Sequence, residues 1–279
     1  EELASAGCRR LMIYHDITPP QLLAGAPLLT VAAARAGVER AGWAARQVMA
    51  VAAHSHSSAA ALESYGGPSS TVIPYLLRQD LLAAAPDRGV LSQSKLRHST
   101  LLVAGRVLPH KRVEDAILVF DYLRRVSSRT WGLVVVGSTD QAPGYVQSLR
   151  ELCRRMGLPR VQFTGAVSQA ELNAWFRIAR AYLSMSAHEG FSVPLVEAMY
   201  HGVPVFALAA AAVPETLRGA GVSFDSADWP AIAEMIETVD GDEALRSRIV
   251  EAQTEVAAAY APEAVSREWN GWLAGSQKN

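Results

Sequence analysis

A short apolar run, a glycine and a proline follow one another between residues 181 and 202, and their order constrains the fold more than any other feature. Residues 181–183 predict a buried strand and Gly190 predicts a turn. Pro194 suits the first position of a helix, since its φ is preset and its missing N–H would be unpaired there. Gly202 ends the helix pattern. A strand that turns into a helix N-terminus presents free backbone N–H groups, so we expect an anion site here.

Two carboxylates flank this predicted anion site, Glu189 in the turn and Glu197 in the first turn of the predicted helix. A ligand with both phosphate and vicinal hydroxyls would use both kinds of group, because amides bind phosphate and a carboxylate accepts from a diol. Glycosyl nucleotides have both parts. In a plainer interpretation, Glu189 is a loop charge and Glu197 only favours the helix dipole.

Strands and helices alternate along the chain, a pattern typical of parallel α/β sheets. In the first third, strands are predicted at 11–14, 48–53 and 72–73, with helices at 26–47 and 59–65. Residues 76–97 are mixed and polar, and we interpret them as a linker. The alternation then restarts, with strands predicted at 100–104, 132–137, 161–165, 181–186, 203–207 and 222–224. We therefore expect two α/β domains, at residues 1–96 and 97–261.

The last predicted helix, at residues 263–273, presents an apolar face. Val265, Trp269 and Trp272 recur at spacings of four and three, which places them on one side of a helix. Such a face must be buried, and the sheet of the second domain should already be covered by its own helices. We therefore expect residues 262–279 to pack back on the first domain.

The composition excludes several classes of protein. A formal net charge of −1 and a 50% share of hydrophobic residues indicate neither a nucleic-acid-binding protein nor a disordered chain. Cys8 and Cys153 lie in different halves and fit no metal spacing, which favours a reduced, cytoplasmic compartment. No apolar run reaches the length of a transmembrane helix. Peripheral association with a membrane stays open.

Residues 186–199 read Ser-Ala-His-Glu-Gly-Phe-Ser-Val-Pro-Leu-Val-Glu-Ala-Met, and Gly-Val-Pro-Val follows at 202–205. This run resembles the signature of the retaining glycosyltransferases of nucleotide-sugar family 4 (glycosyl transferases group 1). The resemblance extends through most of the second half of the chain. It implies the GT-B architecture, in which two Rossmann-like domains with parallel sheets face each other. It also implies a nucleoside-diphosphate sugar as donor, no cofactor besides, no essential metal, and a sugar, lipid-linked or small-molecule acceptor.

Gly105, Arg106 and Lys111 follow the strand predicted at 100–104. Ligands collect at the carboxyl ends of strands in a doubly wound sheet, so two cations there suit a diphosphate. They would also stabilise the charge that a diphosphate gains as it leaves a sugar. A solvated basic loop would have the same composition. The family has Gly-Arg, a Pro and then Lys at this place, which implies the diphosphate role for Arg106 and Lys111.

The resemblance also implies roles for the signature residues. Glu189 matches the carboxylate that reaches hydroxyls of the donor sugar or stabilises the positive anomeric centre. The amides of Gly190 and Phe191 would face the phosphate or the sugar. Glu197 would hold the ribose diol.

The base of the nucleotide is expected between two further loops, which follow Gly137 and Gly165 at the same edge of the sheet. Val167 is a candidate contact through its backbone atoms, and a plain packing role fits it equally well. The sequence identifies neither the base, the sugar nor the acceptor.

His15 ends the first predicted strand and would face the same cleft from the other domain. The family places a histidine there, near the 6-hydroxyl of the donor sugar, which implies a catalytic role. Without the resemblance, His15 would be a hydrogen-bonded structural residue. Asp16 would touch the acceptor or cap the loop. His54 and His56 have no third metal ligand of suitable type nearby in the sequence, so we interpret both as loop residues that line the cleft.

Two departures from the family pattern bear on function. Residues 208–215 lack the paired glycines that many members carry, although Pro-Glu-Thr is kept at 214–216. The first domain shows no opening strand with a Gly-rich loop, so we expect it to be incomplete. A nucleotide-sugar epimerase or phosphorylase of the same fold is therefore an alternative, as is a non-catalytic nucleotide-sugar-binding module.

Overall fold

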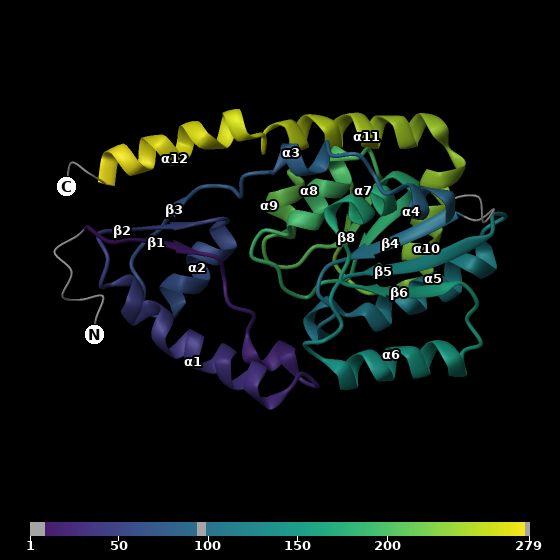
Figure 1. Cartoon of the computed structure of the whole chain (residues 1–279), viewed down its shortest axis with the longest axis horizontal. Coiled ribbons are helices and arrows are strands. Elements are labelled where there is room, and N and C mark those ends of the chain that lie inside the picture. The colour runs from purple at the N-terminus through teal and green to yellow at the C-terminus, as the bar shows by residue number, and fades with distance from the viewer. Residues whose placement is uncertain (1–8, 94–98, 277–279) are drawn as a thin grey trace.

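Two parallel sheets organise the chain, one in each of two lobes (Figure 1). The computed structural model describes residues 9–93 and 99–276. The smaller lobe has three strands in the order β1-β2-β3, and the larger lobe has six in the order β6-β5-β4-β7-β8-β9. Both sheets pair their strands in parallel throughout the described residues. The α/β fold with parallel sheets is therefore confirmed, with a Rossmann-like larger lobe and part of a second such domain in the smaller lobe.

The smaller lobe alternates strand and helix. Its elements are β1 (Leu11–Tyr14), the 3-10 helix η2 (Pro20–Leu23), α1 (Leu28–Ala45), β2 (Ala50–Ala53), α2 (His56–Ser64) and β3 (Thr71–Val72). Helix α2 begins three residues before the predicted start, because Ser55 is its N-cap and accepts a hydrogen bond from the backbone N–H of Ser58. Tyr14, Val51 and Leu62 are buried together and join β1, β2 and α2.

The larger lobe repeats the alternation more regularly. Its strands are β4 (Ser99–Ala104), β5 (Trp131–Val136), β6 (Val161–Gly165), β7 (Ala179–Ser184), β8 (Val205–Leu208) and β9 (Val222–Phe224). Its helical elements after residue 99 are η4 (Pro109–Lys111), α5 (Val113–Val126), α6 (Pro143–Arg155), α7 (Gln169–Ile178), α8 (Val193–Tyr200), α9 (Val213–Leu217), α10 (Trp229–Gly241) and α11 (Glu243–Ala258).

Two apolar clusters sandwich the six-stranded sheet. One joins the sheet to α5, α6 and α10, and it includes Leu101, Phe120 and Ile236. The other joins the opposite face to α7, α8 and α9, and it includes Leu102 and Leu195. Since successive strand residues face opposite sides, neighbouring leucines of β4 belong to different clusters. A sheet buried on both faces is what a parallel sheet requires.

The stretch expected as a linker packs on the larger lobe. It contains two short helices, α3 (Gln79–Leu82) and α4 (Arg88–Gln93). Leu77, Leu82 and Val90 are buried in the same cluster as α7 and α8. The chain therefore crosses between the lobes just before Leu77.

The last helix, α12 (Pro262–Ser276), lies along the smaller lobe (Figure 1). Val265 is fully buried with Ala52 and Ile73, and Trp269 and Trp272 pack against the same cluster. In the view of Figure 1, α12 lies on one side of the small sheet and α1 and α2 lie on the other. The chain thus returns to the lobe in which it began. Within the described residues, none of the helices is both long and apolar enough to span a bilayer.

The N-terminus of α2 is docked on the larger lobe. The carboxylate of Glu215 in α9 accepts hydrogen bonds from the backbone N–H groups of His56 (2.7 Å) and Ser57 (2.8 Å). These are donors that a helix leaves unpaired in its first turn, and a carboxylate there also complements the helix dipole. Glu215 therefore acts as a capping group supplied by the other lobe. This is a structural role for the glutamate of the Pro-Glu-Thr sequence at 214–216.

We expect Glu215→Ala to loosen this junction while both lobes stay folded. Losing a helix cap costs about 0.5–2 kcal/mol, so the backbone amides of His56 and Ser57 should exchange with deuterium about three- to thirtyfold faster. Hydrogen-exchange mass spectrometry measures this directly. Glu255, an exposed residue of α11, supplies the matched control Glu255→Ala, which should leave the exchange of these amides unchanged. Unchanged exchange in Glu215→Ala would contradict the capping role.

Candidate active site

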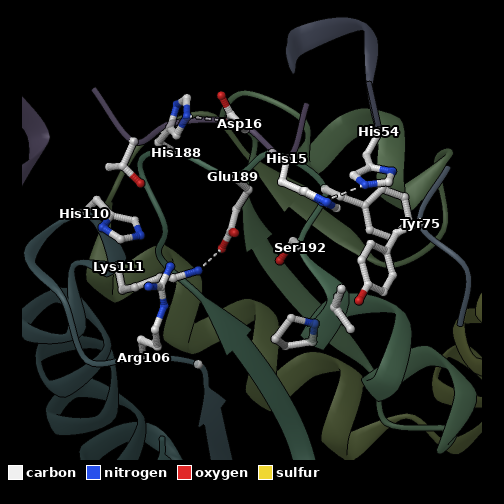
Figure 2. Close-up of a pocket in the computed structure, with 16 residues that line it drawn as sticks. His15, Asp16, His54, Tyr75, Arg106, His110, Lys111, His188, Glu189 and Ser192 are labelled. Carbon is white, nitrogen blue, oxygen red and sulfur yellow. Dashed lines mark hydrogen bonds and ion pairs between the residues drawn. The ribbon is translucent and has the colours of Figure 1, made fainter. Parts of the chain in front are cut away.

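The order of the six strands locates a ligand site. β4 and β7 are neighbours, but from β4 the chain proceeds to β5 and β6 on one side, and from β7 to β8 and β9 on the other. Such a switch point leaves a crevice outside the carboxyl ends of the two strands. A cavity of about 380 Å³ lies there, lined by residues of both lobes (Figure 2). Its size falls within the range of small-molecule sites.

Lys111 and Glu189 form an ion pair at the centre of this cavity. Lys111 belongs to η4, after β4, and Glu189 belongs to the loop after β7, so the pair bridges the two sides of the switch point. Lys111 Nζ lies 2.5 Å from Glu189 Oε1, and the two side chains are only 16% and 11% exposed. Charges this shielded from water interact strongly with each other and with any ligand that enters.

Arg106 stands at the rim of the cavity. It follows Gly105, whose N–H donates to the carbonyl of Val136 at the end of β5. The Arg106 side chain is exposed and donates to Gln141 Oε1 at 3.3 Å. Its guanidinium is therefore held only loosely and can reach a ligand.

Gly137 sets the spacing behind Arg106 without lining the cavity. It follows β5, and a Cβ atom at this position would lie 1.9 Å from the carbonyl oxygen of Gly105. Any side chain there would push the ends of β4 and β5 apart. Close packing of the ends of β4 and β5 thus explains why residue 137 is a glycine. Its predicted place beside the base stays a prediction.

The loop after β7 ends in the N-terminus of α8. Ser192 is the N-cap in a left-handed conformation with φ of 70°, Val193 is the first helical residue and Pro194 the second. The helix thus begins one residue earlier than predicted. Ser192, Val193 and Pro194 line the cavity. Because proline has no N–H and the N–H of Leu195 donates to the carbonyl of Ser192, the free amides presented there are those of Ser192 and Val193.

Gly190 lets the two lobes approach each other. A Cβ atom at Gly190 would lie 2.6 Å from the Cβ of Asp16. Its carbonyl accepts hydrogen bonds from the hydroxyls of Ser55 (2.8 Å) and Ser58 (3.0 Å), at the start of α2. Phe191, next in the chain, is buried and packs edge-on against Tyr260 at 5.1 Å between ring centroids.

The smaller lobe contributes the opposite wall. His15 and Asp16 follow directly after β1, and Asp16 takes the uncommon φ of 77°. Its Oδ1 accepts a hydrogen bond from the N–H of Ile17 (2.8 Å), which supports this conformation. Its Oδ2 lies 2.7 Å from Nε2 of His188, across the junction of the lobes. His15 is the neighbouring wall residue, and Figure 2 shows it on the same side of the cavity as Tyr75.

His110 lies buried beside the two cations. Burial lowers its pKa to about 3, and the positive charges of Lys111 and Arg106 and the neighbouring His188 act in the same direction. The ring is therefore neutral at ordinary pH. Its carbonyl accepts a hydrogen bond from the N–H of Ala187 (2.8 Å), which ties the two loops of the switch point together.

Glu197 differs most from its prediction. It lies in the second turn of α8 rather than the first, and it is not among the residues that line the cavity. Burial raises the pKa of its carboxyl to about 7. Within the described residues, the side-chain carboxyl of Glu197 has neither a hydrogen-bond partner nor an ion-pair partner. A half-buried carboxyl without a partner is costly when ionised and marks a candidate binding group.

The structure brings most of the predicted residues together. Those that line the cavity are His15, Gly105, Arg106, Lys111, Glu189, Gly190 and Phe191. Val167 packs against the core of the larger lobe outside the cavity, so its contact with a base stays a prediction.

Several lining residues were not predicted as site residues. They are Thr18, Tyr75, His110 and His188. His110 and His188 each precede a predicted site residue, so loop membership was an available signal. Tyr75 follows β3, at a strand end that the sequence placed near the linker.

His54 and His56, at the start of α2, lie in different surroundings. His54 lines the cavity, as expected, whereas His56 is exposed and places its Nδ1 3.0 Å from Glu215. His56 therefore lies outside this cavity, because the start of α2 turns its ring towards α9. It lines a neighbouring cavity between the lobes, together with His54 and Glu215. Among residues 9–93 and 99–276, no three His, Cys, Asp or Glu side chains converge as metal ligands would.

Comparison with known proteins identifies the family. Residues 92–256, more than half of the chain, match the model of the glycosyl transferases group 1. The chain belongs to this family. It is also similar in fold to Anabaena HepE, crystallised with UDP and glucose, with a TM-score of 0.78 and 21% identity over 96% of this chain and 72% of that one. That likeness supports the GT-B fold alone.

Two curated relatives of this group 1 chain are glycosyltransferases. The O-antigen chain mannosyltransferase B of Escherichia coli is 27% identical over 142 residues, which are 50% of this chain and 37% of that protein. The D-inositol 3-phosphate glycosyltransferase of a Nocardioides species is 29% identical over 184 residues, which are 61% of this chain and 40% of that protein. The chain thus spans less than half the length of these curated relatives.

The substitution Glu197→Gln tests the raised pKa, because it removes the titrating carboxyl of Glu197. Its folded-state pKa of about 7 lies above the ordinary 4.5, so the folded chain retains a proton that the unfolded chain loses, and stability falls as pH rises through this interval. We therefore expect the free energy of unfolding of the variant, relative to that of the unsubstituted chain, to be higher at about pH 8 than at about pH 5. The increase should be up to about 3 kcal/mol. Urea unfolding at both pH values measures the gain.

The control for this prediction is Glu255→Gln, at an exposed position of α11. It should show no pH-dependent gain. A difference between Glu197→Gln and the unsubstituted chain that is the same at both pH values would show that the carboxyl titrates normally.

Proposed function

We propose that this chain transfers a sugar from a nucleoside-diphosphate sugar to an acceptor hydroxyl, with retention of anomeric configuration and without an essential metal. The observation that carries the proposal is the ion pair of Lys111 and Glu189 at the switch point. One member suits a phosphate and the other suits sugar hydroxyls, and both lie beside the free amides of α8.

The diphosphate of the donor would bind to Lys111, Arg106 and the amides at the start of α8. Lys111 is paired with Glu189, and a phosphate oxygen would compete for its ammonium group. As the bond to the sugar breaks, negative charge grows on the diphosphate, and fixed cations stabilise this charge without reorganising. This is the work that a metal ion does in other transferases, which is why we propose that none is needed.

The sugar would lie between Glu189 and His15. Glu189, released from Lys111, would accept hydrogen bonds from sugar hydroxyls, and His15 would contact the sugar from the smaller lobe. Glu197 would accept from the ribose diol, and an ionised carboxylate that is unpartnered within the described residues would gain two donors in that way.

In the proposed reaction, the bond between the anomeric carbon and the diphosphate oxygen breaks. A new bond to the acceptor oxygen forms on the same face of the sugar, through an oxocarbenium-like transition state. The proton of the acceptor hydroxyl passes to the departing diphosphate, so atoms and charge balance. The carboxylate of Glu189 would stabilise the positive anomeric centre.

The comparisons support the choice of substrates to test. HepE was crystallised with UDP-glucose, and the two curated relatives are named for transfer to an O-antigen chain and to D-inositol 3-phosphate. We therefore propose UDP- and GDP-sugars as donors, and sugars, phosphorylated polyols or lipid-linked glycans as acceptors, in polysaccharide or glycoconjugate synthesis. We also propose that the protein works in the cytoplasm, alone or beside a membrane surface.

Donor turnover tests the proposal against its alternatives. A glycosyltransferase consumes the donor only with an acceptor, an epimerase changes the donor sugar alone, and a phosphorylase requires phosphate. Binding without any turnover would indicate a binding module. The anomeric coupling constant of the product, measured by NMR, separates retention from inversion.

Lys111→Ala and Arg106→Ala should each weaken the binding of UDP or GDP by about tenfold or more, while binding of the free nucleoside stays nearly unchanged. Charge-assisted hydrogen bonds contribute about 1.5–3 kcal/mol each, and tenfold corresponds to about 1.4 kcal/mol. Calorimetric titration measures both ligands. Arg248→Ala, at an exposed position of α11, is the matched control. Equal losses for nucleoside and diphosphate would refute the assignment.

A further inference from the structure

Two histidines of the smaller lobe form a chain of hydrogen bonds that ends in the cavity. Nε2 of His54 lies 2.9 Å from Nδ1 of His15, and Nδ1 of His54 lies 3.1 Å from the carbonyl oxygen of Ile73 (Figure 2 shows the contact between the rings). His54 directly follows β2, His15 follows β1, and Ile73 follows β3. The hydrogen-bond chain therefore runs across all three strand ends of the lobe.

The carbonyl at the far end fixes the direction of both hydrogen bonds. A carbonyl only accepts, so Nδ1 of His54 must carry a hydrogen. A neutral imidazole has one N–H, which leaves Nε2 of His54 as an acceptor. Nδ1 of His15 must then donate to it, and Nε2 of His15 keeps its lone pair. Each tautomer follows from the one before it.

The surroundings of His54 keep its ring neutral and in place. The residue is 8% exposed, and burial lowers the pKa of the imidazole, with the nearby His15 acting in the same direction. The ring of Tyr75 packs edge-on at 5.3 Å and the ring of Trp269 at 6.2 Å between centroids. Tyr75 lies where the chain leaves the lobe, and Trp269 lies on α12, where the chain returns.

We propose that His54 is a positioning residue that holds His15 as the Nδ1–H tautomer, so that Nε2 of His15 accepts a hydrogen bond from a hydroxyl of the ligand. Within the described residues, Nε2 of His15 has no partner, and the ring lines the cavity. The ligand group that it selects is therefore a hydrogen-bond donor, such as a sugar hydroxyl. That the ligand is a sugar rests on the proposed function, whereas the tautomer of His15 does not.

The plainer interpretation is that His54 only fills space and satisfies the carbonyl of Ile73. The two interpretations differ at His15. If His54 is only structural, replacing it leaves the tautomer of His15 unchanged. If it is a positioning residue, His15 loses its acceptor and returns to the tautomer mixture of a free imidazole.

Long-range proton–nitrogen NMR of the full chain with ¹⁵N-labelled histidine distinguishes these outcomes, because protonated and unprotonated ring nitrogens have different ¹⁵N shifts. In the unsubstituted chain we expect His15 to carry its proton on Nδ1 alone. In His54→Leu, which fills the space without hydrogen bonds, we expect a mixture with the Nε2–H form. His56→Gln, at the exposed histidine two residues on, is the control and should leave the His15 signals unchanged.

His54→Gln tests the role without emptying the site. A glutamine amide has an NH2 group that donates and a carbonyl oxygen that accepts, so it can donate to Ile73 and accept from His15, as the histidine does. We expect it to restore the Nδ1–H tautomer that His54→Leu loses. The His54→Gln variant also tests the proposal if His54→Leu fails to fold. If His54→Gln folds and still donates to the carbonyl of Ile73, but His15 no longer has a single tautomer, the proposal is contradicted.

Ligand binding supplies the second readout. With the sugar nucleotide that turnover identifies, kcat/KM should fall about tenfold in His54→Leu, which corresponds to one lost hydrogen bond, while the affinity for the bare nucleoside diphosphate stays the same. A His15 that stays on Nδ1–H in His54→Leu, or that carries its proton on Nε2 in the unsubstituted chain, would overturn the proposal. Absence of turnover with every donor would instead reject the proposed function and leave the NMR result decisive.

Discussion

The close contact at Gly190 is the constraint on which the cavity depends. Its missing side chain lets Asp16 of the smaller lobe approach, and its carbonyl accepts the hydroxyls of Ser55 and Ser58. Because Gly190 directly follows Glu189, the same contact fixes the loop that carries the central carboxylate. His15, directly before Asp16, is fixed in the same way from the other side. This contact therefore limits the distance between the two walls, and any side chain at Gly190 would widen the cavity by separating them.

Charge within the cavity is balanced before any ligand arrives. Lys111 and Glu189 neutralise each other away from water, where each alone would be costly. A third cation between Lys111 and Arg106 would upset this balance, and His110 avoids it because burial and both neighbours lower its pKa to about 3. The loop thus places a polar ring next to two cations without adding a charge. The cavity lining carries two cations, Lys111 and Arg106, and two carboxylates, Glu189 and Asp16. We propose that the sugar binds on the side of Glu189.

The sequence predicted what local patterns determine and missed what long-range contacts determine. Apolar runs, and the glycine or polar residues that end them, predict the strand ends at Tyr14 and Ala104 and the turn at Gly190. The loops that carry His15, Arg106 and Glu189 could therefore be found from the sequence. The partner of Glu215 lies more than 150 residues away in the chain, and no spacing reveals it. Ala211, in the segment without the family's paired glycines, adopts a φ of 49°, a left-handed conformation that composition alone does not predict. The depth of Glu197 likewise depends on how α8 packs, not on its position in the helix.

The contact of α12 with the small sheet and the contacts between the lobes beside the cavity have different consequences for motion. Val265, Ala52 and Ile73 join α12 to the small sheet through apolar burial, which is lost in full if the surfaces separate. Beside the cavity the lobes meet through polar contacts. The hydrogen bonds of Ser55 and Ser58 contribute only about 0.5–1.5 kcal/mol each net, because water can replace them, and the helix cap from Glu215 contributes about 0.5–2 kcal/mol. Opening should therefore occur at the cavity, with α12 and the crossing before Leu77 as the hinge. Such a hinge lets a ligand enter while His54, packed against Trp269 of α12, keeps its place beside His15.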